Sequence, residues 1–436
     1  MGVVIMKERT PSGGGLLQNR AYLALISSQL VSNLGDWLQM LALITMIGLK
    51  WQATSWQITI AMLCILIPML LGGSLAGMLA DRMERKKLMI ISDVARAAIV
   101  LGLVFVTQLW QVYLLLIAKG IFDVMFSPAK NGKLKEIVAP EHMETAVSYS
   151  AIIEQGSKII GPALGGLLTV AFGVSICFII DSVSFLLSAI ILIGVPSKRN
   201  IIRANAVDGL LEKKKKFKFW NELAAGIKII SGIPLIAFGT LTLTMVLLVL
   251  QIADSQAIVL FREIPGIPQS LFGWCITLSG VGTLAAVGVS KLLRNWSPLS
   301  KIGTGGALLG AAFALSGFLV IFGLFNSIGY ASMAVIFFVA GLGAGLVFIP
   351  FQVMLQKRTP ESLTGRVFGT VTSLTSTAAV LGPICGGFLV TTFGPAPAFM
   401  LSGCLMIVIG LVLLLFKSAI LKRDREVTES LLEAAS

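Results

Sequence analysis

Residues 154–166 read EQGSKIIGPALGG, an apolar stretch that also contains an acid, a base, a proline and four glycines. A charged side chain at the centre of a bilayer costs at least about 2.5 to 3.5 kcal/mol. Glu154 and Lys158 are therefore expected to face a protein-lined cavity, where their i,i+4 spacing allows them to pair. Their face of the predicted helix indicates the inside of a membrane bundle.

The small residues of this stretch predict close helix packing. Gly161 and Gly165 form a small-xxx-small ridge that allows a neighbouring backbone to approach. Pro162 removes one backbone donor and bends the helix. A plain packing seam without further function is the alternative interpretation of these residues.

The Gly-Pro-x-x-Gly-Gly frame occurs a second time, about half a chain later. Its second copy consists of Gly382, Pro383, Gly386 and Gly387. Flanking pairs recur as well: Phe126 and Pro128 as Phe348 and Pro350, Pro140-Glu141 as Pro360-Glu361, and Phe172-Gly173 as Phe393-Gly394. The offsets stay between 220 and 222 residues. Such self-similarity is typical of a duplicated transporter whose two halves rock around a central site.

The composition is too apolar for a soluble protein of this size. Hydrophobic residues make up 56% of the 436 residues, charged residues make up 13%, and the mean hydropathy is +0.92. A spanning helix needs about 20 residues, and the sequence contains twelve apolar segments separated by short polar breaks. We predict an all-α integral membrane protein with twelve transmembrane helices in two pseudo-symmetric six-helix bundles.

The net charge of +13 follows the predicted topology and indicates no nucleic-acid partner. If both termini are cytoplasmic, most Lys and Arg residues fall inside and only Lys50 and Arg262 lie outside, which is the positive-inside pattern. We therefore expect a multi-pass protein of a bacterial inner membrane, with its basic segments at the anionic inner leaflet. The predicted parts are a cytoplasmic tail at 1–21, a six-helix bundle at 22–194, a basic cytoplasmic linker at 195–230, a second bundle at 231–416 and a cytoplasmic tail at 417–436.

The sequence contains few features that would indicate an enzyme. No Gly-x-x-x-x-Gly-Lys-[Ser/Thr] loop occurs, which excludes the use of ATP through such a loop. The cysteines have no metal-ligand or redox spacing and are expected to be small buried residues: Cys64, Cys177, Cys275, Cys385 and Cys404. We expect no catalytic residue, no cofactor and no metal.

Other charges inside predicted spans are functional candidates because of the same energetic cost. Asp36 lies near the middle of the helix expected at 22–46, and Asp254 has the corresponding place in the helix expected at 232–261. An ionisable side chain at this depth is a candidate for binding cargo or a coupling ion.

Two further pairs of opposite charge lie within the first half. Lys119 and Asp123 are spaced i,i+4 and form either a cavity wall or a neutralised packing pair. Asp93 and Arg96 are spaced i,i+3 near the inner membrane edge, where we expect a structural ion pair.

The segment at 77–86 resembles the loop signature between the second and third helices of the major facilitator superfamily. The matching residues are Gly77, Asp81, Arg82, Arg85 and Lys86. In that family the acid caps a helix of the opposite half and stabilises the outward-open state, so the resemblance implies that these are gate residues. Glu84 stands where the family pattern usually has glycine, which implies a different local turn. A plain topology determinant is the alternative.

The fifth helix resembles the antiporter motif of drug:proton exporters of that family, through Gly156, Gly161, Pro162, Gly165 and Gly166. Four further features resemble a subgroup that contains macrolide efflux proteins, the enterobactin exporter and the lysophospholipid transporter. These features are Gly35-Asp36, Asp93 with Arg96, Phe126-x-Pro128-Ala129 and Asp181-x-x-x-Phe185. Asp181 itself is expected to be structural.

The resemblance implies a secondary active exporter that exchanges protons for an amphipathic small molecule, such as a macrolide-like drug or a siderophore, by alternating access. A lipid flippase is the alternative, and a non-transporting sensor is a third hypothesis, against which the retained charges argue. The predicted proton-coupling residues are Asp36, Glu154, Asp123 and Asp254, with Lys119 and Lys158 beside them. We expect the protein to be a monomer.

Overall fold

The structure is a computed structural model that describes residues 16–197, 226–266, 270–323, 327–359 and 364–433. Within these limits the regular elements are helices. The first half contains η1 (Leu16–Gln18), α1 (Arg20–Thr45), η2 (Met46–Lys50), α2 (Ser55–Arg82), α3 (Arg85–Gly102), α4 (Leu109–Ile137), η3 (Pro140–His142), α5 (Met143–Phe172) and α6 (Val174–Ile193). The second half contains α9 (Pro234–Asp254), α10 (Ala257–Arg262), α11 (Ser270–Leu292), α12 (Pro298–Ile321), α13 (Ser327–Arg358), α14 (Thr364–Phe393) and α15 (Pro395–Glu433).

Twelve of the described elements are long helices, six in each half. Nine helical segments of the described chain are long and apolar enough to cross a membrane. The other three long helices are α2, α3 and α5. Of these, α3 and α5 carry charged side chains, and most side chains in the second half of α2 lie outside the described residues. The predicted all-α membrane architecture is confirmed.

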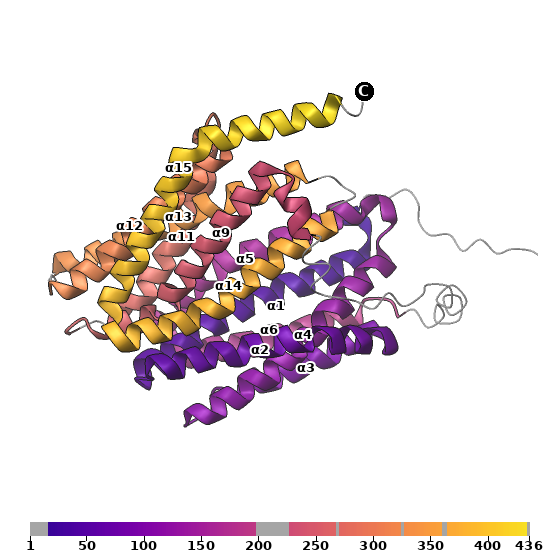
Figure 1. Ribbon diagram of the computed structural model, residues 1–436. Coiled ribbons are helices and arrows are strands. Elements are labelled where there is room, and N and C mark those ends of the chain that lie inside the picture. Colours follow the sequence, from indigo (N-terminus) through magenta and orange to yellow (C-terminus); the bar gives the residue numbers. More distant parts are fainter. Residues whose placement is uncertain (1–15, 198–225, 267–269, 324–326, 360–363, 434–436) are drawn as a thin grey trace, which may run out of the picture.

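The two halves form two groups of helices, coloured indigo to magenta and red to yellow in Figure 1. Inside the first half α1 packs on α5 and α6, α2 on α4, and α3 on α4 and α6. Inside the second half α9 packs on α14 and α15, α11 on α13, and α12 on α13 and α15. Each contact in one half therefore has its equivalent in the other, as the sequence repeat predicts.

One repeated glycine has the same backbone conformation in both halves. Gly173 joins α5 to α6 with a φ of 82°, and Gly394 joins α14 to α15 with a φ of 85°. A positive φ of this size is strained for a residue with a Cβ atom, so glycine suits both junctions. The repeated Phe-Gly pair thus serves the same turn twice.

Two helices differ from the sequence-based expectation. The helix expected at 232–261 is broken into α9 and α10, because Gln256 leaves the helical path and its side chain donates to Ser55 O at 3.3 Å and Thr59 Oγ1 at 3.2 Å on α2. At the end of the chain, α15 continues as a helix past residue 416, where we expected the tail to begin.

The far part of α15 is attached to the second half through Asp424. This buried carboxylate accepts from Leu235 N at 3.2 Å, at the start of α9, and pairs with Arg358 at 3.1 Å, at the end of α13. An acid at a helix N-terminus satisfies an otherwise free N–H group and interacts favourably with the helix dipole. The linker expected at 195–230 lies mostly outside the described residues, and its limits stay a prediction.

The two halves meet at the end of the molecule where α1 passes to α2, called here the α1–α2 end. All hydrogen bonds between described residues of different halves lie at this end. Arg262 donates to Ala53 O at 2.8 Å, Thr59 to Pro383 O at 3.1 Å, and Thr277 to Ala163 O at 3.0 Å.

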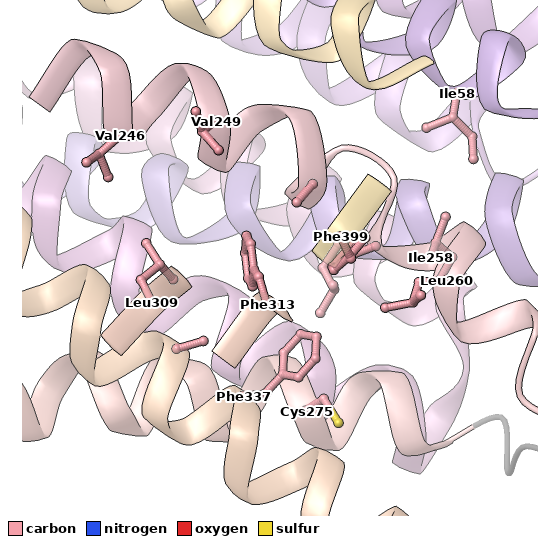
Figure 2. Packing of buried hydrophobic residues seen from close by; sticks show 14 of the residues in the cluster. Ile58, Val246, Val249, Ile258, Leu260, Cys275, Leu309, Phe313, Phe337 and Phe399 are labelled. Atoms are coloured by element: carbon pink, nitrogen blue, oxygen red, sulfur yellow. The ribbon is translucent and has the colours of Figure 1, made fainter. Parts of the chain in front are cut away.

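A buried apolar cluster also crosses between the halves at this end. It includes Ile58 of α2 together with Ile258 and Leu260 of α10, and it continues into the second half around Phe313 and Phe399, whose ring centroids are 5.4 Å apart (Figure 2). Ile58 and Ile258 are fully buried. Apolar burial and hydrogen bonds therefore close the α1–α2 end together.

Gly166 allows one of the close contacts between the halves. A Cβ atom added there would lie 2.5 Å from Thr277 Oγ1 and 3.2 Å from the carbonyl carbon of Gly273 on α11. We predict that Gly166→Val opens the α1–α2 end, because overpacking costs about 1 to 3 kcal/mol and would shift a two-state equilibrium by about 5- to 150-fold. Spin labels at 105 and 322, beyond the ends of α3 and α12, should report longer distances.

The matched control for this experiment is Gly156→Val, on the same helix. An added Cβ at Gly156 has no neighbouring atom within 4 Å, so the distance distribution should stay as in the parent protein. Equal distributions for both variants would contradict the assignment of Gly166 to the closure of this end.

Candidate functional site

Five charged side chains from three helices form a continuous chain of ion pairs in the first half. Lys119 of α4 donates to Asp36 Oδ1 of α1 at 2.7 Å and to Asp123 Oδ2 at 3.0 Å. Arg96 of α3 donates to Asp123 Oδ1 at 3.1 Å and also pairs with Asp93. The order is acid, base, acid, base, acid, so every neighbour has the opposite charge. We call Asp36, Lys119, Asp123, Arg96 and Asp93 the ion chain.

Aromatic rings and a hydroxyl complete the environment of the ion chain. The Arg96 guanidinium lies 4.4 Å from the ring centroid of Phe126 and 4.3 Å from that of Phe185. Ser188 of α6 donates to Asp93 Oδ2 at 2.6 Å. Cation–π contacts and hydrogen bonds to both carboxylate oxygens lower the energetic cost of charges in a medium of low polarity.

Asp36 on α1 is the most exposed member of the ion chain, and Asp93 is the least exposed. The side chains are 0% exposed at Asp93, 5% at Arg96, 11% at Lys119, 18% at Asp123 and 29% at Asp36. Asp36 is therefore the end through which an ion or a cargo molecule can reach the chain. The expected pairings of Lys119 with Asp123 and of Asp93 with Arg96 are both present, and the structure joins them into one group.

Asp181 of α6 lies next to this group although it was expected to be structural. It is fully buried, and its Oδ1 accepts from Ser184 Oγ at 3.1 Å. Its Oδ2 has no hydrogen-bond partner in the part of the chain that the structure describes. Gly35 of α1 passes directly over it, so that a Cβ atom at Gly35 would collide with the carboxylate.

Glu154 and Lys158 form the predicted i,i+4 pair at 2.9 Å but are separate from the ion chain. Their side chains are 51% and 40% exposed. Ser150, one turn earlier on α5, donates to Gln29 Oε1 of α1 at 2.6 Å and lies 3.5 Å from the Lys130 ammonium. The pair thus lies on an exposed face of α5, and its role in coupling stays a prediction.

Asp254 is the last residue of α9 and is exposed. Among the residues that the structure describes, it has no ion-pair or hydrogen-bond partner. The second half therefore offers a single acid at this place and no equivalent of the ion chain.

The antiporter motif packs α5 against helices of both halves. A Cβ atom added at Gly161 would lie 3.2 Å from Trp37 Cγ, and one at Gly165 would lie 3.4 Å from Leu38 Cα, both on α1. Gly166 faces α11 of the other half, and Pro162 lies inside the helix. These contacts agree with the predicted packing ridge.

The second copy of the frame on α14 packs in the equivalent way. A Cβ atom at Gly382 would lie 3.0 Å from Leu248 O, and one at Gly386 would lie 3.1 Å from Ser255 Oγ, where α9 ends. At Gly387 it would lie 2.6 Å from Thr59 Oγ1 of α2, in the other half. Pro383 lies inside α14 and supplies the carbonyl that accepts from Thr59.

The predicted gate segment is described only in part. Gly77, Asp81 and Arg82 belong to α2, and their side chains lie outside the described residues. Arg85 donates to Gly132 O at 3.0 Å and pairs with Glu136 at 2.8 Å, while Lys86 donates to Ile193 O at 2.6 Å. These two bases hold the start of α3 against the ends of α4 and α6.

Glu84 occupies its turn without strain. Its φ of −66° and ψ of 114° are extended values that any residue adopts, so the glycine of the family pattern is not needed here. A hydrogen bond from Ser197 lowers the pKa of the Glu84 carboxyl below its usual value, and Lys87 at 3.2 Å acts in the same direction.

The described residues contain no group of three or more His, Cys, Asp or Glu side chains that could hold a metal ion. The five cysteines are free. Cys64, Cys177 and Cys275 are buried as expected, but Cys385 and Cys404 are exposed because they lie on the outward faces of α14 and α15. The expectation that all cysteines are buried was wrong for these two.

Sequence reasoning found the members of the ion chain but missed that they form one unit. The contact between Asp36 and Lys119 joins residues 83 positions apart and depends on how α1 and α4 are rotated. The signal available in the sequence was that the predicted spans of the first half contain more acids than bases. Pairing along a single helix cannot neutralise all of these charges, so pairs between neighbouring helices are expected.

The family model of the Major Facilitator Superfamily matches residues 25–377 and 257–434. An uncharacterized MFS-type transporter, YfiS of Bacillus subtilis (strain 168), is 39% identical over 94% of this chain and 96% of its own length. Macrolide efflux protein A of Streptococcus pyogenes is 24% identical over 81% of this chain and 86% of its own. The enterobactin exporter EntS of Shigella flexneri is 25% identical over 83% of both chains.

Solved structures agree on the fold. The nucleoside transporter NupG superposes with a TM-score of 0.64 at 13% identity, over 92% of this chain and 99% of that chain. An inward-facing, unoccupied bacterial homologue of the human lysosomal transporter Spinster superposes with a TM-score of 0.63 at 14% identity, over 96% of this chain and 99% of that chain. The chain therefore belongs to the Major Facilitator Superfamily and is a multi-pass membrane transporter.

Proposed function

We propose that this protein is a secondary active exporter of an amphipathic small molecule, driven by protons that enter as cargo leaves. The observation that carries the proposal is the buried Lys119 ammonium of α4, which bridges Asp123 of the same helix to the partly exposed Asp36 of α1. A carboxylate at the exposed end of a buried ion chain can take up a proton, and protonation removes its ion pair with Lys119.

The contacts between the halves support an alternating-access cycle. The halves are joined by hydrogen bonds at the α1–α2 end, and the described residues at the opposite end form no such bond across the halves. If the termini are cytoplasmic, as the charge distribution predicts, this arrangement is closed to the outside and open to the cytoplasm. Cargo would then enter the exporter from the inside in this state.

The relatives favour export and an amphipathic cargo. Macrolide efflux protein A and the enterobactin exporter are named for the export of a macrolide and of a siderophore, respectively. We extend export to this chain and propose the same broad class of cargo. The protein would act as a monomer in the plasma membrane of a bacterium, with Glu154 as a second proton carrier beside Asp36.

We predict that Asp36→Asn reduces uphill transport by about a hundredfold, the size expected when a proton-transferring group is removed. The assay is efflux of a labelled macrolide from proteoliposomes with an imposed pH gradient. Exchange of the macrolide without a gradient should remain, because the amide keeps the shape of the carboxylate and binds cargo. Glu154→Gln should reduce uphill transport less than Asp36→Asn does. The Glu154–Lys158 pair is exposed, so water can solvate Lys158 when the carboxylate is removed.

The control for both variants is Glu426→Gln, which changes an exposed acid on α15 outside the ion chain. Its transport should equal that of the parent protein. Full uphill transport by Asp36→Asn and Glu154→Gln, singly and together, would contradict proton antiport. Sodium coupling or a lipid-flipping cycle would then be the better hypothesis.

We further propose that Asp81 acts at the inner gate by capping a helix of the opposite half when the cytoplasmic side closes. Such a contact contributes about 0.3 to 2 kcal/mol, so Asp81→Asn should shift the population toward the inward-open state by about 2- to 30-fold. Spin labels at 83 and 357, at the inner ends of α2 and α13, would report this shift. The same distance distribution with Asp and Asn at position 81, in a variant that still folds, would refute the gate role.

A further inference from the structure

Asp181 is the one acid beside the ion chain that has no base of its own. The ion chain holds three acids and two bases, and each of its carboxylates is paired. Asp181 adds a fourth acid at 0% exposure. A charge there would be unpaired and without water, which is the most costly arrangement for a carboxylate in a membrane.

The hydrogen bonds of Asp181 fit a carboxylic acid better than a carboxylate. The single proton of the Ser184 hydroxyl is shared between Asp181 O at 2.8 Å and Asp181 Oδ1 at 3.1 Å, and Oδ2 has no partner among the described residues. A buried carboxylate with so few donors costs far more than a neutral carboxylic acid, because an unpaired charge is penalised more than an unpaired polar group. The lone oxygen is therefore the place for a bound proton.

We propose that Asp181 is a second proton-binding site that works together with Asp36, an inference that rests on the proton-driven function proposed above. The proton passes from the Asp181 carboxylic acid to the Asp36 carboxylate, which leaves Asp181 ionised and Asp36 neutral. The total charge is unchanged, and Lys119 exchanges one acid partner for the other.

Charged side chains on three neighbouring helices lie near Asp181. From α1, Asp36 directly follows Gly35, which lies on the Asp181 carboxylate. From α4, the Lys119 ammonium lies 5.7 Å from the ring centroid of Phe185, one helical turn from Asp181 on α6. The Arg96 guanidinium of α3 lies 4.3 Å from the centroid of the same ring.

The remaining neighbours of Asp181 do not compete for the proton. Cys177, one turn earlier on α6, contacts Thr169 of α5 at 3.4 Å and is a free thiol. Ser182 donates to Ala97 O of α3 at 2.8 Å. Asp36, Lys119 and Arg96 are thus the charged groups that act on Asp181 from the helices packed against it.

The position of Asp181 also suits a proton that enters from outside. In the predicted topology α6 runs inward from Val174, and Asp181 lies about 10 Å nearer its outer end than Ser188, which binds Asp93. Asp181 therefore lies nearer the outside than Asp93, the far end of the ion chain.

The second half supports a role beyond packing. At the repeat offset of 221 residues, Asp181 corresponds to Ser402, which is equally buried. At the offset of 222, Lys119 and Asp123 correspond to Gly341 and Gly345. The counterparts of Asp181, Lys119 and Asp123 are thus uncharged residues in the second half, where Asp36 keeps an acidic counterpart in Asp254. The fold tolerates serine at the position of Asp181.

The test compares Asp181→Asn with Asp36→Asn and a structural control. Ser182→Ala is the control, because it removes a buried hydrogen bond on the same turn of α6 but no proton site. Each variant is assayed for pH-driven efflux of a labelled macrolide and for exchange without a gradient. Asp181→Asn should lose uphill efflux by about tenfold or more and keep exchange, while Ser182→Ala keeps both.

Infrared spectra give a readout that does not depend on transport. The protein at neutral pH should show the C=O stretch of a buried carboxylic acid that is lost in Asp181→Asn and kept in Ser182→Ala. If Asp181→Asn does not fold, Asp181→Ser replaces it, because the second half carries serine at this place.

The outcomes separate the two proposals. Loss of uphill efflux in Asp36→Asn but not in Asp181→Asn or Asp181→Ser would overturn the role of Asp181 alone. A carboxylic-acid band unchanged by either substitution would overturn it as well. Full uphill efflux in Asp36→Asn would instead refute the proton-driven function itself.

Discussion

The ion pair between Lys119 and two carboxylates is the interaction on which the first half depends. A lone ammonium at this depth would cost at least about 2.5 to 3.5 kcal/mol, and Lys119 is only 11% exposed. Its bonds to Asp36 at 2.7 Å and Asp123 at 3.0 Å hold α1 against α4, and Arg96 extends the chain to α3. Changing the charge of any member removes an ion pair from its neighbour, so the position of these helices is sensitive to one proton.

The second half uses the same helix arrangement with a different kind of contact. Gly341 and Gly345 take the places of Lys119 and Asp123, and α13 lies close to α11. A Cβ atom added at Gly341 would lie only 2.8 Å from Ser279 Cα. Backbone packing of this kind has no state that depends on a proton. The duplicated fold thus combines a half whose contacts respond to protonation with a half that stays close-packed.

Much of this fold and part of the site follow from the sequence. The Gly-Pro-x-x-Gly-Gly repeat predicts two similar halves, and i,i+4 spacing predicts the pair of Glu154 with Lys158. Both predictions depend on short motifs that are visible in the sequence itself. The bond between Asp36 and Lys119 could not be predicted, since it depends on the rotation of two distant helices. The break at Gln256 is missed for a related reason: it follows from hydrogen bonds to α2, more than 190 residues earlier.

Helix α1 connects the ion chain to the contact between the halves. Asp36 faces Lys119, while the next residue, Trp37, packs on Gly161 of α5, so the two sides of α1 touch the charges and the antiporter motif. Five residues further along α5, Gly166 lies against α11 of the other half. Glycines leave no compressible side chain at these crossings, and a shift of α1 therefore moves α5 and alters its contact with α11. The glycine motif is best understood as the rigid part of this connection, and the ion chain as the part that responds to protonation.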